Sequence, residues 1–314
     1  MGWVSAIIGV VGATATGKSM LALDLTERLG GEVVNTDAMQ VYRGMDVGTA
    51  KLAPAERRGV PHHLVDLLDV TETASVAEFQ RLARRVIADC RDRGRIPVLV
   101  GGSALYTRAV LDELEFPGTD PQVRARLEAE LAEVGPARLH RRLAERDPQA
   151  AAEILPSNGR RIVRALEVGE LTGRPFAATL PAARYHDPAS VQVGLDIDRE
   201  TLDRRIEQRV ELMWQRGLVD EVRSLAEHGL REGRTADRAL GYRQVLAYLD
   251  GRIGEDEARA QTVAATRRFA RRQDSWFRKD DRVHWLRYDD RQLVEKAIDV
   301  VGSAPTCARA GRPA

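Results

Sequence analysis

The chain has 314 residues, of which 43% are hydrophobic and 30% are charged, and its formal net charge is +1 at pH 7. This length allows one large domain or about two of ordinary size, and the composition is typical of a soluble globular protein. No apolar run approaches the roughly 20 residues that span a membrane. The two cysteines, Cys90 and Cys307, have no metal-binding spacing, which argues against a zinc site or a disulfide framework and favours the cytoplasm.

Short apolar runs alternate with helical patterns in the first third of the chain. The runs Val4–Val11, Val33–Val34 and Ile96–Val100 are predicted strands, and the first lacks the basic leader and cleavage site of an export signal. Helices are predicted at Lys18–Leu29 and Val76–Asp92. Strands that alternate with helices are typical of a mostly parallel sheet with helices on both faces, so the predicted fold class is α/β.

The middle of the chain, residues 119–188, shows helical patterns alone. Asp120 is a predicted helix cap, and Pro121 follows it at the first helical position. Three helices are predicted here: Pro121–Val134, Pro136–Arg146 and Asn158–Leu171. We therefore expect an all-helical domain inserted into a catalytic core that is formed by residues 1–118 and 189–301.

A strand pattern returns after this segment. Hydrophobic residues alternate from Val191 to Ile197, as they do in a strand. Long helices are then predicted at Thr201–Gln215, Val219–Glu227 and Ala258–Phe277. Residues 302–314 are rich in Gly, Ala, Pro and Arg, and we expect them to form a disordered tail.

A phosphate-binding loop lies between the first predicted strand and the first predicted helix. Its residues match the pattern G-x-x-x-x-G-K-[ST], and they are Gly12, Ala13, Thr14, Ala15, Thr16, Gly17, Lys18 and Ser19. The glycines let backbone N–H groups point at phosphate oxygens, Lys18 adds a full charge, and Ser19 can bind Mg²⁺. A glycine turn with a purely structural role would not need Lys18 and Ser19 at this offset.

The phosphate loop leaves open phosphoryl transfer, nucleotide hydrolysis or the departure of pyrophosphate as a leaving group. Enzymes of the first two kinds usually hold Mg²⁺ with an acid at the end of a nearby strand. The strand Ile96–Val100 instead runs into Gly101-Gly102-Ser103, although Asp66 could still fill that role. This pattern weakens the ATPase interpretation without excluding it.

Positive charge gathers in two segments, Arg160–Arg164 and Arg267–Lys279. Such segments either form solvated helix faces or bind nucleic-acid phosphates, even in a chain that is nearly neutral. The arginines of the first segment fall within about one helical turn, so two or three of them can face a phosphate backbone together.

Two pairs of neighbouring side chains have more than one possible role. Trp276 and Phe277 could stack on bases, but we expect both to lie in the core because each would bury a large apolar area. His62 and His63 could bind a metal, but adjacent histidines on an expected loop make a poor isolated site, so we assign them no role.

The segment after the second predicted strand is the most specific part of the sequence. It reads Asn35-Thr36-Asp37-Ala38-Met39-Gln40-Val41-Tyr42-Arg43-Gly44-Met45-Asp46-Val47-Gly48-Thr49-Ala50-Lys51. This run resembles the hallmark D-[SA]-x-x-[VI]-Y-[RK]-G-M-D-[IV]-G-T-A-K of the tRNA dimethylallyltransferases. Further runs that resemble this family are Gly101–Tyr106, Arg161–Glu167, Gly241–Gln244 and Arg272–Arg278, and the resemblance spans about residues 5 to 287.

The resemblance implies a kinase-like phosphate-loop core with an inserted helical domain, Mg²⁺ as cofactor and a monomer. It also implies the reaction. A dimethylallyl group moves from dimethylallyl diphosphate to the N6 amine of the adenosine 3′-adjacent to the anticodon in tRNA, and pyrophosphate is released. The expected partners are therefore dimethylallyl diphosphate and the anticodon stem-loop of tRNA.

An adenine amine is a poor nucleophile because its lone pair is delocalised into the ring, so a carboxylate must take its proton during attack. We expect Asp37, at the end of the second strand, to be this base; its alternative role is an ordinary loop or helix cap. The departing pyrophosphate needs positive charge, which the phosphate loop supplies. By resemblance, Arg209 adds a cation, and Thr14 and Ser19 contact phosphate or Mg²⁺.

By the same resemblance, residues that contact tRNA fall in five segments. They are Asp37, Ala38, Met39, Gln40, Ser103, Arg124, Arg160, Arg161, Ile162, Val163, Arg164, Arg238, Gly241, Tyr242 and Arg243. The chain departs from the family pattern at Leu155–Asn158, where His-Pro-Asn-Asp is common, and at Arg160, where Gln is common. Ser103 replaces a common Thr and keeps its hydroxyl. No C-terminal Cys/His zinc element like that of some eukaryotic relatives is present, which favours a bacterial-type enzyme.

Two other functions remain open from the residues. A small-molecule kinase would share the phosphate loop and could use Asp37 to deprotonate a hydroxyl, but it would not need the cluster Arg160–Arg164. A non-enzymatic nucleotide switch that binds RNA would use the loop to sense nucleotide and the helical insertion to bind its partner. Retained RNA binding without prenyl transfer would support the switch.

Overall fold

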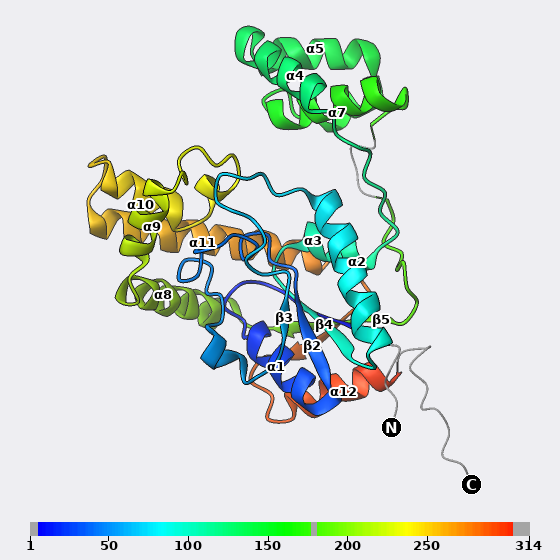
Figure 1. The fold of residues 1–314 in the computed structure, drawn as a ribbon, viewed down its shortest axis with the longest axis vertical. Coiled ribbons are helices and arrows are strands. Elements are labelled where there is room, and N and C mark those ends of the chain that lie inside the picture. The colour runs from blue at the N-terminus through cyan, green and yellow to red at the C-terminus, as the bar shows by residue number, and fades with distance from the viewer. Residues whose placement is uncertain (1–5, 177–180, 304–314) are drawn as a thin grey trace. The chain divides into compact units, whose positions relative to one another are not determined.

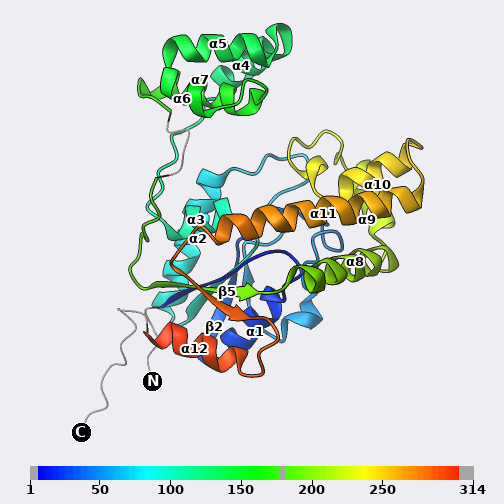
Figure 2. The same cartoon turned by 180° about the vertical axis from the view of Figure 1, so that it is seen from behind.

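The computed structural model describes residues 6–176 and 181–303, and it divides into two compact units (Figures 1 and 2). Unit 1 combines Met1–Asp112 with Tyr185–Ala314, and unit 2 is Glu113–Arg184. The last helix, α12 (Leu293–Ser303), reaches Ser303, so the prediction that a disordered tail begins at residue 302 is wrong for its first two residues. Residues 304–314 of the predicted tail, like Val4 and Ser5 of the first predicted strand, lie outside the described residues.

Unit 1 is built on a six-stranded sheet in the order β3-β2-β4-β1-β5-β6. The strands are β1 (Ile7–Val11), β2 (Gly31–Asn35), β3 (His62–His63), β4 (Ile96–Val100), β5 (Ser190–Asp196) and β6 (Val283–Arg287). All five neighbouring pairs are parallel, which confirms the predicted α/β fold class. β3 and β6 were not predicted, because β3 has two residues and β6 buries only Val283.

Helices cover both faces of this sheet (Figure 1). On one face, α1 (Lys18–Leu29) and α12 pack apolar side chains such as Leu21 and Val301 against Ile8 and Val193. On the other face, α2 (Val76–Asp92) and α3 (Ala104–Leu111) form a second cluster with side chains of β2 and β4. The two clusters follow from the alternation of side chains along each strand.

Four further helices of unit 1 pack in succession: α8 (Arg199–Gln215), α9 (Leu218–Glu227), α10 (Tyr242–Leu249) and α11 (Glu255–Phe277). Short 3-10 turns form at Pro54–Arg57 and Ala236–Arg238. Phe277 is buried between Val11 and Val283, as predicted. Trp276 is 38% exposed, so the prediction that it lies in the core is wrong; the Arg108 guanidinium of α3 lies over its ring, 5.8 Å from the ring centre.

Helices are the only regular secondary structure among the described residues of unit 2. They are α4 (Pro121–Val134), α5 (Pro136–Arg146), α6 (Pro148–Glu153) and α7 (Gly159–Thr172). Side chains cap three of these helices: Asp120 accepts from Gln122 and Val123 N–H, and Asn158 accepts from Arg161 N–H. The short α6, capped by Asp147, was not predicted because its six residues are too few to show a helical period.

No helix within the described ranges 6–176 and 181–303 is long and apolar enough to cross a bilayer.

Candidate active site

The loops after β1, β2 and β4 meet at the carboxyl edge of the sheet, because neighbouring parallel strands end there together. Thr36, just after β2, donates its N–H to the Val100 carbonyl at 2.8 Å. Gly101 approaches Thr36 so closely that a Cβ on it would lie 2.4 Å from the Thr36 hydroxyl. Only glycine fits at this position, and this close approach brings Asp37 next to the phosphate loop.

The phosphate loop has the backbone shape that anion binding requires. Gly12 and Gly17 have φ values of 125° and 105°, and Ala15 also has a positive φ of 64°. Lys18 is buried, and its ammonium donates a hydrogen bond to the Ala13 carbonyl at 2.5 Å. The Thr16 hydroxyl donates to the same carbonyl at 2.9 Å, so the loop is held in place from within. Such a loop at the start of a helix can surround a phosphate with N–H groups.

Three charged side chains meet beside this loop. The pKa of Lys18 is lowered to about 7, chiefly by burial and also by the positive charge of Arg209, whereas the negative charge of Asp37 opposes both effects. Burial also lowers the pKa of Arg209, again opposed by Asp37. The structure therefore brings together Lys18, Asp37 and Arg209, which the sequence places on three separate segments.

Gln273 on α11 ties the phosphate loop to the loop after β4. Its amide accepts from Thr14 N–H at 2.9 Å and donates to the Gly102 carbonyl at 2.7 Å. A Cβ on Gly102 would lie 2.2 Å from the Gln273 amide nitrogen. Sequence reasoning gave Gln273 no role, although it stands inside the family-like run Arg272–Arg278.

Asp37 is held at the end of β2 by its neighbours. Its N–H donates to Asn35 Oδ1 at 2.8 Å, and its own Oδ1 accepts from Met39 N–H at 2.8 Å. Asn35 in turn donates to the carbonyls of Asp37 and Leu64. The carboxylate is half-buried and still has its second oxygen to offer to a ligand.

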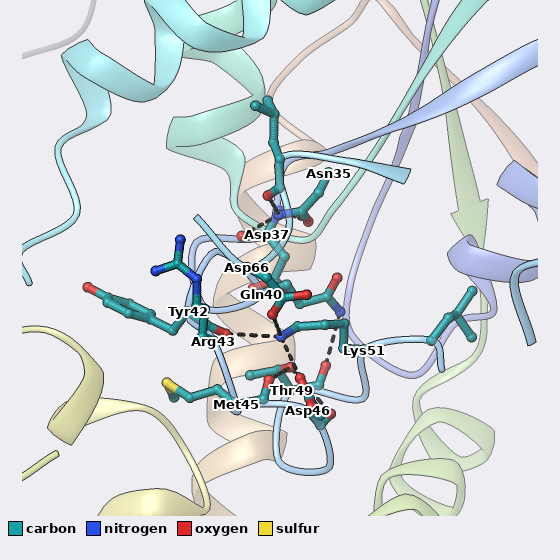
Figure 3. A network of polar contacts seen from close by, with 12 residues as sticks. Asn35, Asp37, Gln40, Tyr42, Arg43, Met45, Asp46, Thr49, Lys51 and Asp66 are labelled. Atoms are coloured by element: carbon teal, nitrogen blue, oxygen red, sulfur yellow. Dashed lines mark hydrogen bonds and ion pairs between the residues drawn. The ribbon is translucent and has the colours of Figure 1, made fainter. Parts of the chain in front are cut away.

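Residues 37–51, which we call the second loop, fold around the buried ammonium of Lys51 (Figure 3). Lys51 donates to the Tyr42 carbonyl at 2.9 Å, to Asp46 at 2.5 Å and to Asp66 at 2.6 Å. Asp66 therefore anchors the second loop in this structure. Gln40 donates to the Thr49 carbonyl at 3.2 Å, and Arg209 donates to the same carbonyl at 3.3 Å.

Two residues expected to contact tRNA, Arg238 and Arg243, line a basic cavity of about 850 Å³ in unit 1. Five arginines and one acid line it: Arg231, Arg238, Arg243, Arg252, Arg268 and Asp237. Arg238 and Arg243 are exposed. Among the expected residues in other parts of unit 1, Ser103 is the N-cap residue of α3, and Gly241, with a φ of 87°, precedes α10.

Three residues expected to contact tRNA have buried side chains, so a contact with tRNA at these positions would have to come from their backbone. Ile162 and Val163 lie in the core of unit 2, and Tyr242 lies in the core of unit 1. Each is at most 2% exposed, so none can reach a ligand in this structure. Family-like runs include such supporting residues because a run of sequence does not distinguish the buried side of a helix from its exposed side.

The four arginines of unit 2 that are expected to contact tRNA differ in their surroundings. Arg124 and Arg164 both pair with Glu167, which is fully buried, and Arg164 also donates to the carbonyls of Pro117 and Gly118. Arg160 and Arg161 are exposed on the first turn of α7. Arg160 and Arg161 are thus the members of this cluster whose side chains reach the surface.

The oxygen donors at the phosphate loop fit Mg²⁺, which prefers hard oxygen ligands and keeps several waters. Ser19, on the first turn of α1, and Thr14 in the loop offer hydroxyls. A second group, Glu32, His63 and Cys90, has ligand atoms within 4.8 Å of one another. It does not fit Mg²⁺, since two of its donors are sulfur and imidazole nitrogen.

This second group is an ionic network around Glu32. Arg93 donates to both carboxylate oxygens, at 2.5 and 2.9 Å, and His63 contacts one of them at 2.7 Å. Arg93 chiefly accounts for the low pKa of Glu32, about 2, whereas burial raises the pKa of Cys90 to about 11. His63 lies on a strand, β3, and not on a loop as expected.

Comparison with known proteins assigns these features to one family. Residues 40–280 match the family model of the IPP transferases. A tRNA dimethylallyltransferase from Nocardioides sp. strain JS614 is 66% identical to this chain over 297 residues, which covers 95% of this chain and 96% of that protein. Another, from Thermobifida fusca, is 63% identical over 305 residues and 95% of each chain.

Solved structures show the same fold. The full-length tRNA isopentenylpyrophosphate transferase from Bacillus halodurans is 40% identical, with a TM-score of 0.68 over 95% of each chain. A eukaryotic dimethylallyltransferase, crystallised acting on tRNA, has a TM-score of 0.78 over 96% of this chain and 76% of its own length. At 24% identity, this second likeness shows a shared fold alone.

Proposed function

Because this chain belongs to the tRNA dimethylallyltransferase family, we propose that it transfers a dimethylallyl group from dimethylallyl diphosphate to the N6 amine of the adenosine 3′-adjacent to the anticodon in tRNA. Pyrophosphate is the second product. The relatives that match nearly the whole chain are prenyltransferases, so the kinase and nucleotide-switch alternatives are set aside.

The main support for this proposal is that basic side chains and a carboxylate lie close together at the carboxyl edge of the sheet. The buried Lys18 and the half-buried Arg209 form a basic region at the phosphate loop, and the Asp37 carboxylate lies close enough to oppose the pKa shifts of both. A reaction that releases an anion and a proton needs both kinds of charge in one place.

Asp37 acts on the acceptor in this mechanism. As the N6 nitrogen forms its bond to the allylic carbon, the amine loses a proton, and the free oxygen of Asp37 takes it. The bond from Oδ1 to Met39 N–H keeps the carboxylate in one orientation during this transfer. The acceptor base must leave its stack to reach the carboxylate, and Ala38, Met39 and Gln40 beside it form part of the proposed tRNA contact.

The phosphate loop acts on the leaving group. When the carbon–oxygen bond to the diphosphate breaks, negative charge grows on pyrophosphate, and the N–H groups of residues 12–19, Lys18 and Arg209 stabilise it. Thr14 and Ser19 would hold Mg²⁺, which when bound supplies further positive charge to the pyrophosphate oxygens. Arg205 adds another cation, since its guanidinium lies 3.7 Å from where a Cβ on Gly17 would stand.

Binding of a diphosphate at about pH 8.5 is expected to take up close to one proton. Lys18, with a pKa of about 7, is mostly neutral at that pH in the free protein, and it becomes charged when it pairs with phosphate. Calorimetry with an unreactive saturated five-carbon diphosphate, in buffers of different ionisation enthalpy, measures this uptake. Lys18→Met should abolish it, and wild-type uptake near zero would contradict the assignment.

We further propose that the basic cavity and the exposed arginines of unit 2 bind the tRNA backbone. The cavity offers Arg238 and Arg243, and unit 2 offers Arg160 and Arg161. Guanidinium groups pair well with phosphate and fix the register of the RNA without reading its sequence. Because its acceptor is tRNA, we place the enzyme in the cytoplasm, and we propose that it acts as a monomer.

Replacing Arg243 with alanine is expected to weaken tRNA binding several-fold and to reduce the slope of log Kd against log salt by about one. The reason is that an exposed arginine on the wall of the cavity neutralises about one phosphate. Filter binding across a salt series measures both quantities. Arg223→Ala, an exposed arginine of α9 that pairs with Asp220, is the control, and equal effects of the two variants would contradict the proposal.

The reaction itself is tested with labelled dimethylallyl diphosphate and unmodified tRNA that carries adenosine 3′ to the anticodon, with and without Mg²⁺. Label transferred to that adenosine supports the proposed function. Phosphorylation of a small acceptor by ATP in place of this transfer would support a kinase, and tRNA binding without transfer would support a switch.

A further inference from the structure

One carboxylate on α9 holds the second loop in place. Glu221 accepts hydrogen bonds from three consecutive backbone N–H groups, those of Asp46 at 3.0 Å, Val47 at 2.7 Å and Gly48 at 3.1 Å. It also accepts from the hydroxyl of Tyr242 at 2.5 Å. Four donors on one carboxylate, drawn from the second loop and from α10, fix the turn at residues 46–48 far more tightly than the loop could fix itself.

The Tyr242 ring closes the other side of this turn. A Cβ on Gly48 would lie 2.4 Å from the ring, so the turn fits only when glycine stands there. The ring is fully buried. Burial and the neighbouring Glu221 raise the pKa of Tyr242 well above its ordinary value, so its hydroxyl stays protonated and donates.

The next residue, Thr49, connects the turn to the active site. Its carbonyl accepts from Arg209 at 3.3 Å and from Gln40 at 3.2 Å. Its hydroxyl donates to the Met45 carbonyl at 2.6 Å, which closes the turn from within. The Thr49 carbonyl therefore contacts both Arg209, which we propose stabilises the pyrophosphate, and Gln40, which we propose contacts the tRNA.

We propose that Glu221 is a positioning residue for prenyl transfer. By holding the turn at residues 46–48 it fixes the Thr49 carbonyl, and through that carbonyl it orients Arg209 toward the diphosphate and Gln40 toward the acceptor base. This inference rests on the proposed function. A role that is only structural would leave the kinetic constants of the folded protein unchanged, and this difference separates the two explanations.

Glu221→Gln tests the proposal, because glutamine keeps the size of the side chain but turns an NH₂ group toward N–H donors. In the folded variant, kcat/KM for dimethylallyl diphosphate is expected to fall about 10- to 100-fold, the range that small misplacements of catalytic groups produce. Pyrophosphate affinity, measured by calorimetry without any turnover, should fall as well. Glu227→Gln, an exposed glutamate of the same helix, is the matched control and should change neither quantity.

A folded Glu221→Gln protein with wild-type kcat/KM and pyrophosphate affinity would overturn the proposal. If that variant does not fold, Tyr242→Phe removes one of the four donors and should lower pyrophosphate affinity in the same direction by a smaller factor; no change would again overturn it. Absence of prenyl transfer by the wild type would defeat the proposed function alone, since the pyrophosphate measurement still tests Glu221.

Discussion

Asp37→Asn is expected to lower the rate of prenyl transfer by about 10²- to 10⁴-fold and to leave tRNA affinity nearly unchanged. Asparagine keeps the shape of the side chain and can still accept from Met39 N–H, the contact that orients the wild-type carboxylate. It cannot take the proton that the adenine amine must lose. Single-turnover transfer with enzyme in excess over tRNA measures the chemical step directly.

The control for this variant is Asp69→Asn, which changes an exposed aspartate that pairs with Arg43 in the same unit. The control should keep wild-type rates. If Asp37→Asn transferred at the wild-type rate, Asp37 would be an ordinary loop cap and a different group would take the proton. A large loss of tRNA affinity with a normal single-turnover rate would instead make Asp37 a tRNA-binding residue alone.

Arg209→Met is expected to lower kcat/KM for the diphosphate donor by about 10²- to 10³-fold, because it removes a half-buried cation from the region where negative charge develops. The same change should raise the pKa of Lys18, since the charge of Arg209 helps to lower it. Proton uptake on diphosphate binding at about pH 8.5 should therefore fall in the variant. Steady-state kinetics and calorimetry measure the two effects.

Arg204→Met is the matched control, because Arg204 is an exposed residue of α8 that pairs with Glu200. It should change neither kcat/KM nor proton uptake. A folded Arg209→Met protein with full activity would remove Arg209 from the catalytic machinery, and with it the part of the Glu221 proposal that acts through this guanidinium.

Local patterns in the sequence predicted the boundaries of several elements correctly. The helices Lys18–Leu29, Val76–Asp92 and Pro121–Val134 were predicted at both ends, because their ends depend on neighbouring residues. Gly30 ends the first in a left-handed conformation, and Ser75 and Asp120 cap the other two. Capping is a short-range effect, so a single sequence contains the information it needs.

Local patterns could not predict the order of the strands or most of the contacts that hold the active-site loops in place. The phosphate loop was found because its pattern is contiguous, but its contact with Gln273 joins residues 259 positions apart. Glu221 and the turn at residues 46–48 are similarly distant. The edge strand β6 was missed because a strand with one buried residue shows no apolar run. Contacts between residues far apart in the chain produce no periodic pattern in any short stretch of the sequence, so the sequence alone does not reveal them.

The two units differ in how their chains are connected, and this difference has a consequence for folding during synthesis. Unit 2 is one continuous segment whose contacts are local, so it can fold as soon as Arg184 has left the ribosome. Unit 1 must wait, because β1 pairs with β5 on one side, and β5 pairs in turn with β6 near the end of the described chain. Until β5 has been made, the backbone N–H and C=O groups on that edge of β1 have no strand to pair with, so we expect the sheet of unit 1 to be completed only late in synthesis.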